Sequence, residues 1–131
     1  MSLRRGASGL LIFVILAVPV PGKKLEITKK VGDLTVEIIM DRDPPIVGKN
    51  AAEIRIRDEQ GAAVQEAKVF LNYYMPPMPR MVPMNYKVEA KRKKDAYLAS
   101  LNLIMAGPWI IILRITRGDK TLSTKFQIDA R

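Results

Sequence analysis

The chain has 131 residues, enough for one domain and a short additional segment. It contains no cysteine and no histidine, which excludes disulfides, iron–sulfur clusters, zinc–thiolate sites and catalysis by Ser-His-Asp or Cys-His groups. Phosphate-binding glycine motifs are also absent from the sequence, so we expect a binding domain and not an enzyme. The net charge of +9 favours contact with anionic surfaces.

The first predicted element is an export segment. Arg4 and Arg5 precede an apolar run over residues 10–20, and a basic stretch followed by about 7–15 apolar residues is typical of a secretory signal. The run is short for a membrane span, which needs about 20 apolar residues; a short retained anchor and a buried core helix are the alternatives. We therefore predict a signal peptide or membrane anchor over residues 1–22. The domain over residues 23–131 is then extracytoplasmic, either periplasmic or on the cell surface, and held at the membrane if the segment is uncleaved.

Strands are the only regular elements that the rest of the chain predicts. Apolar and polar residues alternate with period two in a series of short segments, which are separated by Gly, Pro and Asp turn signals. The predicted strands cover residues 25–31, 34–38, 53–57, 67–74, 86–90, 96–103, 109–115 and 122–128. Such spacing is typical of an all-β, immunoglobulin-like antiparallel β-sandwich of seven to eight strands. We expect Trp109 to lie in its core.

Residues 41–50 and 91–94 are predicted to be connections between strands. The first is a loop rich in proline, and its paired aspartates do not have the spacing of a calcium loop. The second, Lys-Arg-Lys-Lys, is predicted to be a solvated hairpin turn. Nucleic acid is not expected as a partner, because no aromatic stacking pattern accompanies this basic run. An acidic lipid headgroup is an alternative partner for it.

The most unusual feature of the sequence is a methionine–proline run over residues 75–84. Met75, Met78, Met81 and Met84 recur at a constant interval of three. The prolines between them favour polyproline II, which repeats every three residues and rises about 3.1 Å per residue. The four side chains should therefore leave one edge of the segment about 9 Å apart, and they converge if the segment bends.

Soft-metal binding is one interpretation of this run. Thioether sulfur is a soft ligand that selects Cu(I), and the lack of His and Cys restricts any such site to thioethers. The candidate ligands for Cu(I) or Ag(I) are Met75, Met78 and Met81, with Met84 or Met105 as alternates. Cu(I) is the only cofactor that this interpretation implies.

Protein docking and core packing are the other two interpretations. Methionine makes adaptable apolar surfaces for partner proteins. A docking edge would consist of Met75, Met78 and Met81, with Tyr73 and Tyr74 at its base, and would serve assembly of a membrane complex. Alternatively, the methionines simply cover the open end of the core.

The order of short motifs along the chain resembles the YtkA-like domain family, which is also seen in FixH-type proteins. The motifs are GKN at 48–50, IRIRD at 54–58, GAAV at 61–64, AKV at 67–69, MPPM at 75–78, AYLA at 96–99 and MAGPWII at 105–111. The resemblance implies a small extracytoplasmic β-sandwich, often behind one N-terminal membrane segment. Related domains accompany copper-efflux components and the assembly of haem-copper oxidases, so such respiratory or efflux complexes are the implied partners.

The resemblance also bears on the methionines. The Met-Pro-x-Met element of the family corresponds to Met75, Pro76 and Met78, and Met105 occupies a family-like position before the tryptophan. This chain differs in extending the element through two further methionines and in having no histidine near it. Copper chemistry assisted by histidine is therefore not expected here.

Overall fold

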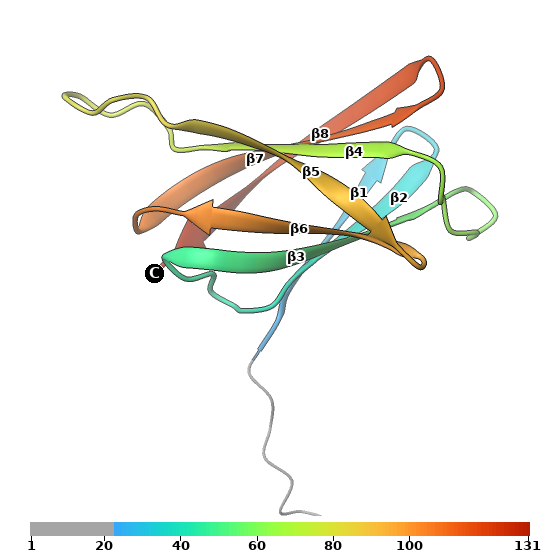
Figure 1. The fold of residues 1–131 in the computed structure, drawn as a ribbon, viewed down its shortest axis with the longest axis horizontal. Helices are drawn as coiled ribbons and strands as arrows, with labels where there is room; N and C mark the ends of the chain where they lie inside the picture. Colours follow the sequence, from blue (N-terminus) through green and yellow to red (C-terminus); the bar gives the residue numbers. More distant parts are fainter. Residues whose placement is uncertain (1–22) are drawn as a thin grey trace, which may run out of the picture.

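The computed structural model describes residues 23–131, which form strands and the connections between them (Figure 1). The predicted signal peptide or anchor over residues 1–22 lies outside this part of the chain. Within residues 23–131, no helix is long and apolar enough to cross a membrane. The strands are β1 (Leu25–Val31), β2 (Leu34–Met40), β3 (Gly48–Arg57), β4 (Lys68–Tyr74), β5 (Asn85–Lys93), β6 (Ala96–Leu103), β7 (Gly107–Arg117) and β8 (Lys120–Ala130).

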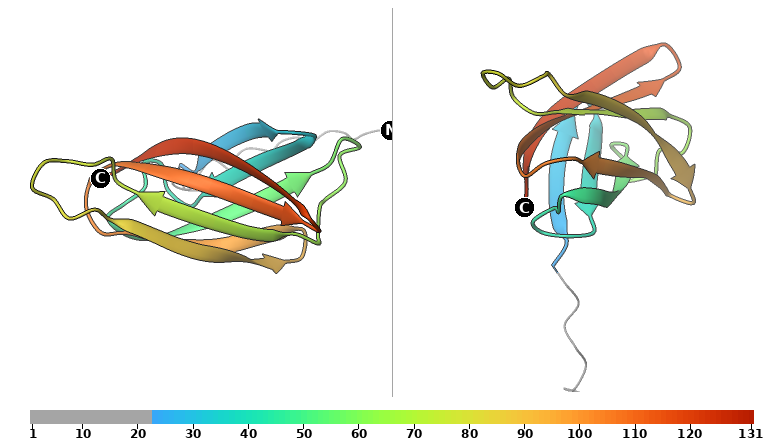
Figure 2. Two further views of the ribbon diagram at one scale, coloured as in Figure 1. Left: turned by 90° about the horizontal axis from the view of Figure 1, so that it is seen from above. Right: turned by 60° about the vertical axis from the view of Figure 1, so that its left-hand side comes forward.

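The strands pair antiparallel in the order β1-β2-β3-β6-β5-β4-β7-β8. β5 belongs to two layers, because residues 85–90 pair with β4 and residues 91–93 pair with β6. Layer A contains β1, β2, β3 and β6, and layer B contains β4, β7 and β8; the two layers face each other (Figure 2). β1 and β8 touch on the remaining side, so the sandwich is nearly closed. The predicted all-β antiparallel sandwich is confirmed.

The core lies between the two layers and follows from the period-two alternation of the strands. Along β2, buried residues alternate with half-buried ones, and β7 directs every second residue inward in the same way. The largest fully buried side chains are Trp109, Tyr97, Leu34, Ile38, Met40, Ile54, Ile56, Leu71, Leu101, Leu103, Ile111 and Leu113. Trp109 is 0% exposed, so its predicted place in the core is confirmed.

Two predicted connections are shorter in the structure than in the sequence interpretation. β3 begins at Gly48, which reduces the first loop to residues 41–47. Lys91, Arg92 and Lys93 lie in β5 and pair with β6, so their assignment to a turn was wrong. Only Lys94 and the aspartate after it form the turn, and Lys94 adopts a φ of 58° there. Cross-strand pairing with β6 extends β5 beyond the point where apolar alternation ends.

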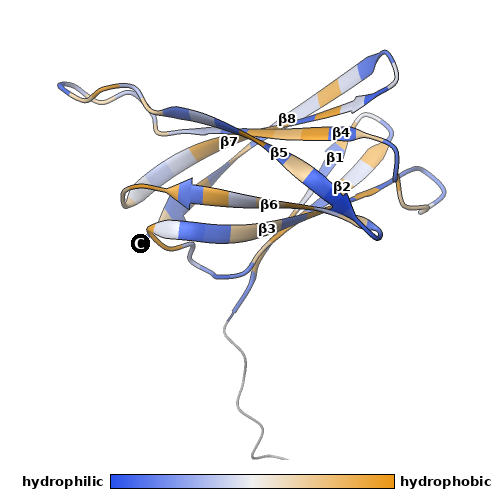
Figure 3. Cartoon of the chain, viewed as in Figure 1, coloured by the Kyte–Doolittle hydropathy of each residue, from blue (hydrophilic) through white to orange (hydrophobic). Residues whose placement is uncertain are grey.

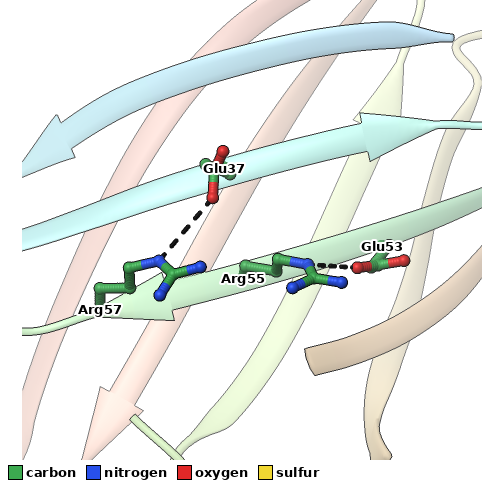
Figure 4. Close-up of polar contacts among 4 residues, drawn as sticks. All are labelled: Glu37, Glu53, Arg55 and Arg57. Atoms are coloured by element: carbon green, nitrogen blue, oxygen red, sulfur yellow. Dashed lines mark hydrogen bonds and ion pairs between the residues drawn. The ribbon is translucent and has the colours of Figure 1, made fainter. Parts of the chain in front are cut away.

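The outward face of β3 presents two arginines, Arg55 and Arg57. Arg57 Nε lies 3.9 Å from Glu37 Oε1 on β2, and Arg55 Nε donates a hydrogen bond to Glu53 Oε2 (Figure 4). Such partly exposed ion pairs contribute about 0–1 kcal/mol each to stability. Because carboxylates offset both guanidinium groups, this face is not a continuous basic surface for nucleic acid.

The antiparallel order gives the sandwich two different ends. The loop end carries the connections over residues 41–47, 75–84 and 104–106, together with Lys23, where the described chain starts, and Arg131. The turn end carries three two-residue turns, at 32–33, 94–95 and 118–119, and the longer β3–β4 connection. Hydrophilic residues dominate the β5–β6 and β7–β8 turns, whereas the β6–β7 connection is largely apolar (Figure 3).

Candidate functional site

Residues 75–84, here called the methionine arm, form the candidate site. The arm continues from Tyr74 at the end of β4 and returns to β5 at Asn85, and these two residues pair with each other. It therefore extends the β4–β5 hairpin beyond the sheet. Figures 1 and 2 show it projecting farther from the body than the neighbouring connections at the loop end.

A tight turn folds the arm back on itself. Met81 N donates a hydrogen bond to Met78 O at 3.2 Å, with Pro79 and Arg80 between them. Arg80 has a φ of 66°, and proline followed by a residue of positive φ is the pattern of a type II turn. The run is therefore not one extended polyproline edge. It bends at Arg80, which is the condition under which the four methionines were expected to converge.

The fold of the arm brings all four of its methionines around one hollow. The hollow has a volume of about 40 Å³ and is lined by Met75, Pro76, Pro77, Met78, Met81, Val82, Pro83 and Met84. A cavity needs at least about 10–15 Å³ to hold a water molecule, so this one has room for a small ion. None of the lining side chains is ionisable, and the four methionines are the lining residues whose side chains carry a potential metal donor.

The four methionines differ in how firmly the protein holds them. Met75 is 5% exposed and belongs to the core, whereas Met84 is partly buried and packs against that core. Met81 is also partly buried, and Met78 is 39% exposed beside the turn. The arm thus has a fixed root and an accessible tip.

Gly107 determines how closely the root of the arm can pack. A Cβ atom added at Gly107 would lie 2.9 Å from Met75 Cε, closer than such contacts allow, and Gly107 has a φ of 125°. The backbone conformation of Gly107 favours glycine, and an added Cβ atom would force the methyl group of Met75 to shift. Gly107 was not among the predicted site residues, although it stands within the MAGPWII motif.

Met105, the fifth candidate ligand, does not line the hollow. Its side chain is partly buried against the core, and its carbonyl accepts a hydrogen bond from Trp109 Nε1 at 3.0 Å. Met105 thus satisfies the buried indole N–H, a role that requires only its backbone. The structure separates it from the other four candidates.

Three aromatic rings support the root of the arm. The Tyr73 ring centroid lies 5.4 Å from that of Tyr86 and 5.9 Å from that of Trp109, and the Tyr86 and Trp109 centroids are 6.4 Å apart. Tyr73 is 6% exposed, and its hydroxyl accepts a hydrogen bond from Asn102 N at 3.3 Å. Of the two tyrosines predicted for docking, Tyr73 faces the core, and Tyr74 is half-buried on the alternate side of β4. The alternation of β5 could have identified Tyr86.

Residues 75–84 contain no carboxylate side chain that would favour a hard cation. Among residues 23–131 there is no group of three or more Asp, Glu, His or Cys side chains placed to hold a metal ion. Arg80 is the ionisable residue within the arm itself. Hard ions such as calcium require several oxygen ligands, whereas neutral thioethers suit a soft monovalent cation. The donor set therefore fits Cu(I) or Ag(I).

The fold is that of a small antiparallel β-sandwich. The chain belongs to the YtkA-like family, whose sequence profile matches residues 28–114. Domains of this family are extracytoplasmic. No curated protein matches the sequence significantly.

A solved structure shares the fold. It is the crystal structure of the PmoD soluble domain from Methylocystis sp. ATCC 49242 (Rockwell), with a TM-score of 0.57 and 14% sequence identity. The alignment covers 79% of this chain and 96% of that chain. At this identity the likeness is one of fold: nearly the whole PmoD domain has its counterpart here.

Proposed function

We propose that this chain is an extracytoplasmic domain that binds Cu(I) or Ag(I) through the thioethers of the methionine arm and serves copper handling or efflux. The observation that carries the proposal is the convergence of Met75, Met78, Met81 and Met84 on one hollow of about 40 Å³. The turn at Arg80 produces this convergence from residues spaced evenly in sequence. Membership of the YtkA-like family supports the extracytoplasmic location, where protein and small-molecule thiols compete less for Cu(I).

In this proposal the arm only coordinates the metal ion and catalyses no reaction. A soft monovalent ion accepts three or four sulfur ligands, and thioethers carry no proton that must leave before the metal binds. Binding should therefore be nearly independent of pH, unlike binding by imidazole or thiolate, which must first deprotonate. Met75 would supply a fixed ligand on the body, and the exposed Met78 would give the ion a route to and from a partner.

Anaerobic Cu(I) titration against a chromophoric chelator tests this function. The comparison is between the wild type and a variant with Met75, Met78, Met81 and Met84 all changed to leucine. Leucine keeps the volume and the apolar character of each side chain but removes the sulfur, so the fold should tolerate it at under about 1.5 kcal/mol per site. We expect one tightly bound Cu(I) in the wild type, with an affinity that varies little with pH, and none in the variant.

Met105→Leu is the matched control for that titration, because Met105 lies in the neighbouring loop and does not line the hollow. This variant should bind Cu(I) as the wild type does. Equal binding by the wild type and the four-leucine variant would rule out the proposed site. Loss of binding in Met105→Leu alone would place the site elsewhere.

A second candidate function is docking to a protein of a membrane complex, such as a respiratory assembly or a copper-efflux component. The observation that favours it is the exposure of Met78 and Val82, at 39% and 80%, on an arm that projects from the body. The four-leucine variant separates the two functions, since a docking surface keeps its shape and hydrophobicity in that variant. Retained capture of a partner from native membranes together with lost Cu(I) binding would indicate both functions. If the wild type captures no partner, docking is excluded.

A further inference from the structure

Exposed apolar side chains are concentrated at the loop end of the sandwich. Within residues 23–131, the exposed large hydrophobic residues are Val47, Met78, Val82, Tyr86, Leu98 and Ile104. Four of them lie on three separate connections of the loop end: Val47 at 44% exposure, Met78 and Val82 on the arm, and Ile104 at 47%. Exposed apolar residues scattered over a surface are ordinary. Their concentration on the connections at one end of the sandwich calls for an explanation.

The chain also enters the domain at this end. Leu25, the first residue of β1, pairs with Met40 at the end of β2. The carbonyl of Lys23 accepts a hydrogen bond from Asp43 N at 3.0 Å, which fastens the incoming chain to the loop that carries Val47. An anchor that fixed the residues before Lys23 would therefore also keep the loop end close to that anchor.

Arg131, which follows β8, forms backbone hydrogen bonds to the same loop. Val47 N donates to Arg131 O at 3.3 Å, and Arg131 N donates to Pro45 O at 2.9 Å. Asn50, which is fully buried, closes the loop from within: its side chain accepts a hydrogen bond from Ile46 N and donates to Ile46 O and Gly48 O. The exposure of Val47 is therefore maintained by a hydrogen-bonded framework.

The sequence before Lys23 is strongly apolar. Its apolar run ends at Val20, three positions before Lys23. Three residues of extended chain span at most about 11 Å. An apolar phase that receives this run would therefore hold Lys23 within about 11 Å of its boundary, a distance comparable to the depth of the headgroup region.

The charges at this end suit the surface of a bilayer. Basic residues outnumber acidic ones around the point where the chain enters and along the arm: Lys23, Lys24, Arg42 and Arg80 against Asp41 and Asp43. Each basic side chain near an anionic leaflet adds to attraction. The longer basic run of β5 points to the opposite, turn end, and so does not take part.

We infer that the loop end of the sandwich rests on a lipid surface, with Val47, Val82 and Ile104 inserted among the headgroups and the turn end directed away from the membrane. Val47, Val82 and Ile104 stand on three separate connections of the loop end. A protein interface needs a contiguous, closely packed area of about 800 Å² on each partner, whereas a fluid bilayer accepts isolated apolar tips at the depth of the acyl boundary.

The absence of cysteine from the chain makes a site-directed test possible. A single cysteine introduced as Val47→Cys, Val82→Cys or Ile104→Cys would carry an environment-sensitive fluorophore. The full-length chain would be reconstituted without copper into vesicles of phosphatidylcholine and phosphatidylglycerol, with nitroxide-labelled lipid as the quencher. Because no metal is added, the outcome does not depend on the function proposed for the arm.

Two matched control positions are Leu98→Cys and Lys94→Cys. Leu98 is an exposed apolar residue, at 39%, on the outward face of β6, and Lys94 lies at the turn end. We expect lipid quenching at positions 47, 82 and 104 to exceed that at positions 94 and 98 by at least about twofold, since interfacial side chains lie about 5–10 Å deep. Equal quenching at all five positions would overturn the inference, as would failure of the full-length chain to float with the vesicles. Shielding of positions 82 and 104 from aqueous iodide without lipid quenching would indicate a protein partner or a second copy, and would overturn it too.

Discussion

The two ends of this sandwich solve the same problem, that of connecting antiparallel strands, in different ways. At the turn end, β1–β2, β5–β6 and β7–β8 are joined by two-residue turns whose first residue has a positive φ: Gly32 at 61°, Lys94 at 58° and Gly118 at 60°. This is the pattern of a type II′ turn, which matches the twist of the strands.

At the loop end the connections are longer and carry apolar tips. The methionine arm alone has ten residues, where two would close the hairpin between β4 and β5. Extra length and exposed apolar surface add nothing that the fold requires, and binding residues are found disproportionately on such loops. The contrast therefore locates function at the loop end and stability at the turn end and in the core.

The largest expected effect separates the root of the arm from its tip. Met75→Ala should lower the free energy of unfolding by about 2–5 kcal/mol, because it empties a buried site in the core. Met78→Ala should change it by less than about 0.5 kcal/mol, since Met78 lies on the exposed tip. Urea titration of both variants measures the difference. Similar losses in the two variants would contradict the division of the arm into root and tip.

Gly107→Ala should cost about 1–3 kcal/mol, because the new methyl group meets Met75 Cε and the backbone has a φ of 125°. A double-mutant cycle with Met75→Ala separates the two causes. The contact contribution should disappear when Met75 is shortened, so the combined loss should be smaller than the sum of the single losses. Strict additivity would show that Gly107 is needed for its backbone alone.

The Tyr97 hydroxyl is expected to stabilise the β3–β4 connection, which is the longest one at the turn end. Its buried hydroxyl donates to Val64 O at 2.9 Å and accepts from Ala67 N at 3.2 Å. Tyr97→Phe keeps the ring but leaves these two backbone groups without their partner, which should cost about 1–3 kcal/mol at neutral pH. Denaturant unfolding at pH 7 gives this number, and an unchanged midpoint would mean that the β3–β4 connection does not need the tyrosine.

The pH dependence of stability should change in the same variant. Burial raises the pKa of Tyr97 above its ordinary value, so the unfolded chain releases this proton at a lower pH than the folded chain. The stabilisation from the neutral hydroxyl is therefore complete below about pH 10 and is lost as the pH rises through the raised pKa. Between pH 9 and 11, wild-type stability should fall more steeply than that of Tyr97→Phe. Parallel curves would contradict the pKa shift.

The smallest effect compares one residue at each end. Lys94 and Arg80 are the non-glycine residues with positive φ among those described, at 58° and 66°. Replacing Lys94 with glycine relieves strain in a turn that pairs both strands, so it should stabilise the fold by roughly 1 kcal/mol. Arg80→Gly should change stability less, because the arm tip adds little to the packed body. Thermal unfolding would show a higher Tm for Lys94→Gly, and a larger gain in Arg80→Gly would reverse the assignment of the two ends.

Much of the fold could be predicted because the alternation of apolar and polar residues that marks a strand can be read within a short segment of sequence. Period-two alternation identified every strand, and Trp109 was expected in the core, where it lies. The double membership of β5 could not be predicted, since nothing in its sequence marks where pairing changes from β4 to β6. The basic run was assigned to a turn for the same reason: cross-strand pairing, and not composition, decides that Lys91 to Lys93 are strand.

The candidate site was predictable in its residue types but not in its shape. Even spacing of the methionines indicated an extended edge, and the residue that bends it, Arg80, is not of a type that favours positive φ. Gly107 and Tyr86 belong to the site only because β7 and β5 bring them beside the arm. Met105 was included through the family resemblance, and its distance from the hollow could not be read from the order of motifs.

The central claim is that a soft cation binds within the methionine arm through sulfur alone. X-ray absorption at the copper edge of the Cu(I)-loaded, full-length chain measures this directly, because sulfur scattering differs from that of nitrogen and oxygen. We predict three or four sulfur ligands and no nitrogen or oxygen ligand in the wild type, and no bound copper in the four-leucine variant. Coordination dominated by nitrogen or oxygen would rule out binding by the methionine arm, because it would place the copper outside the hollow.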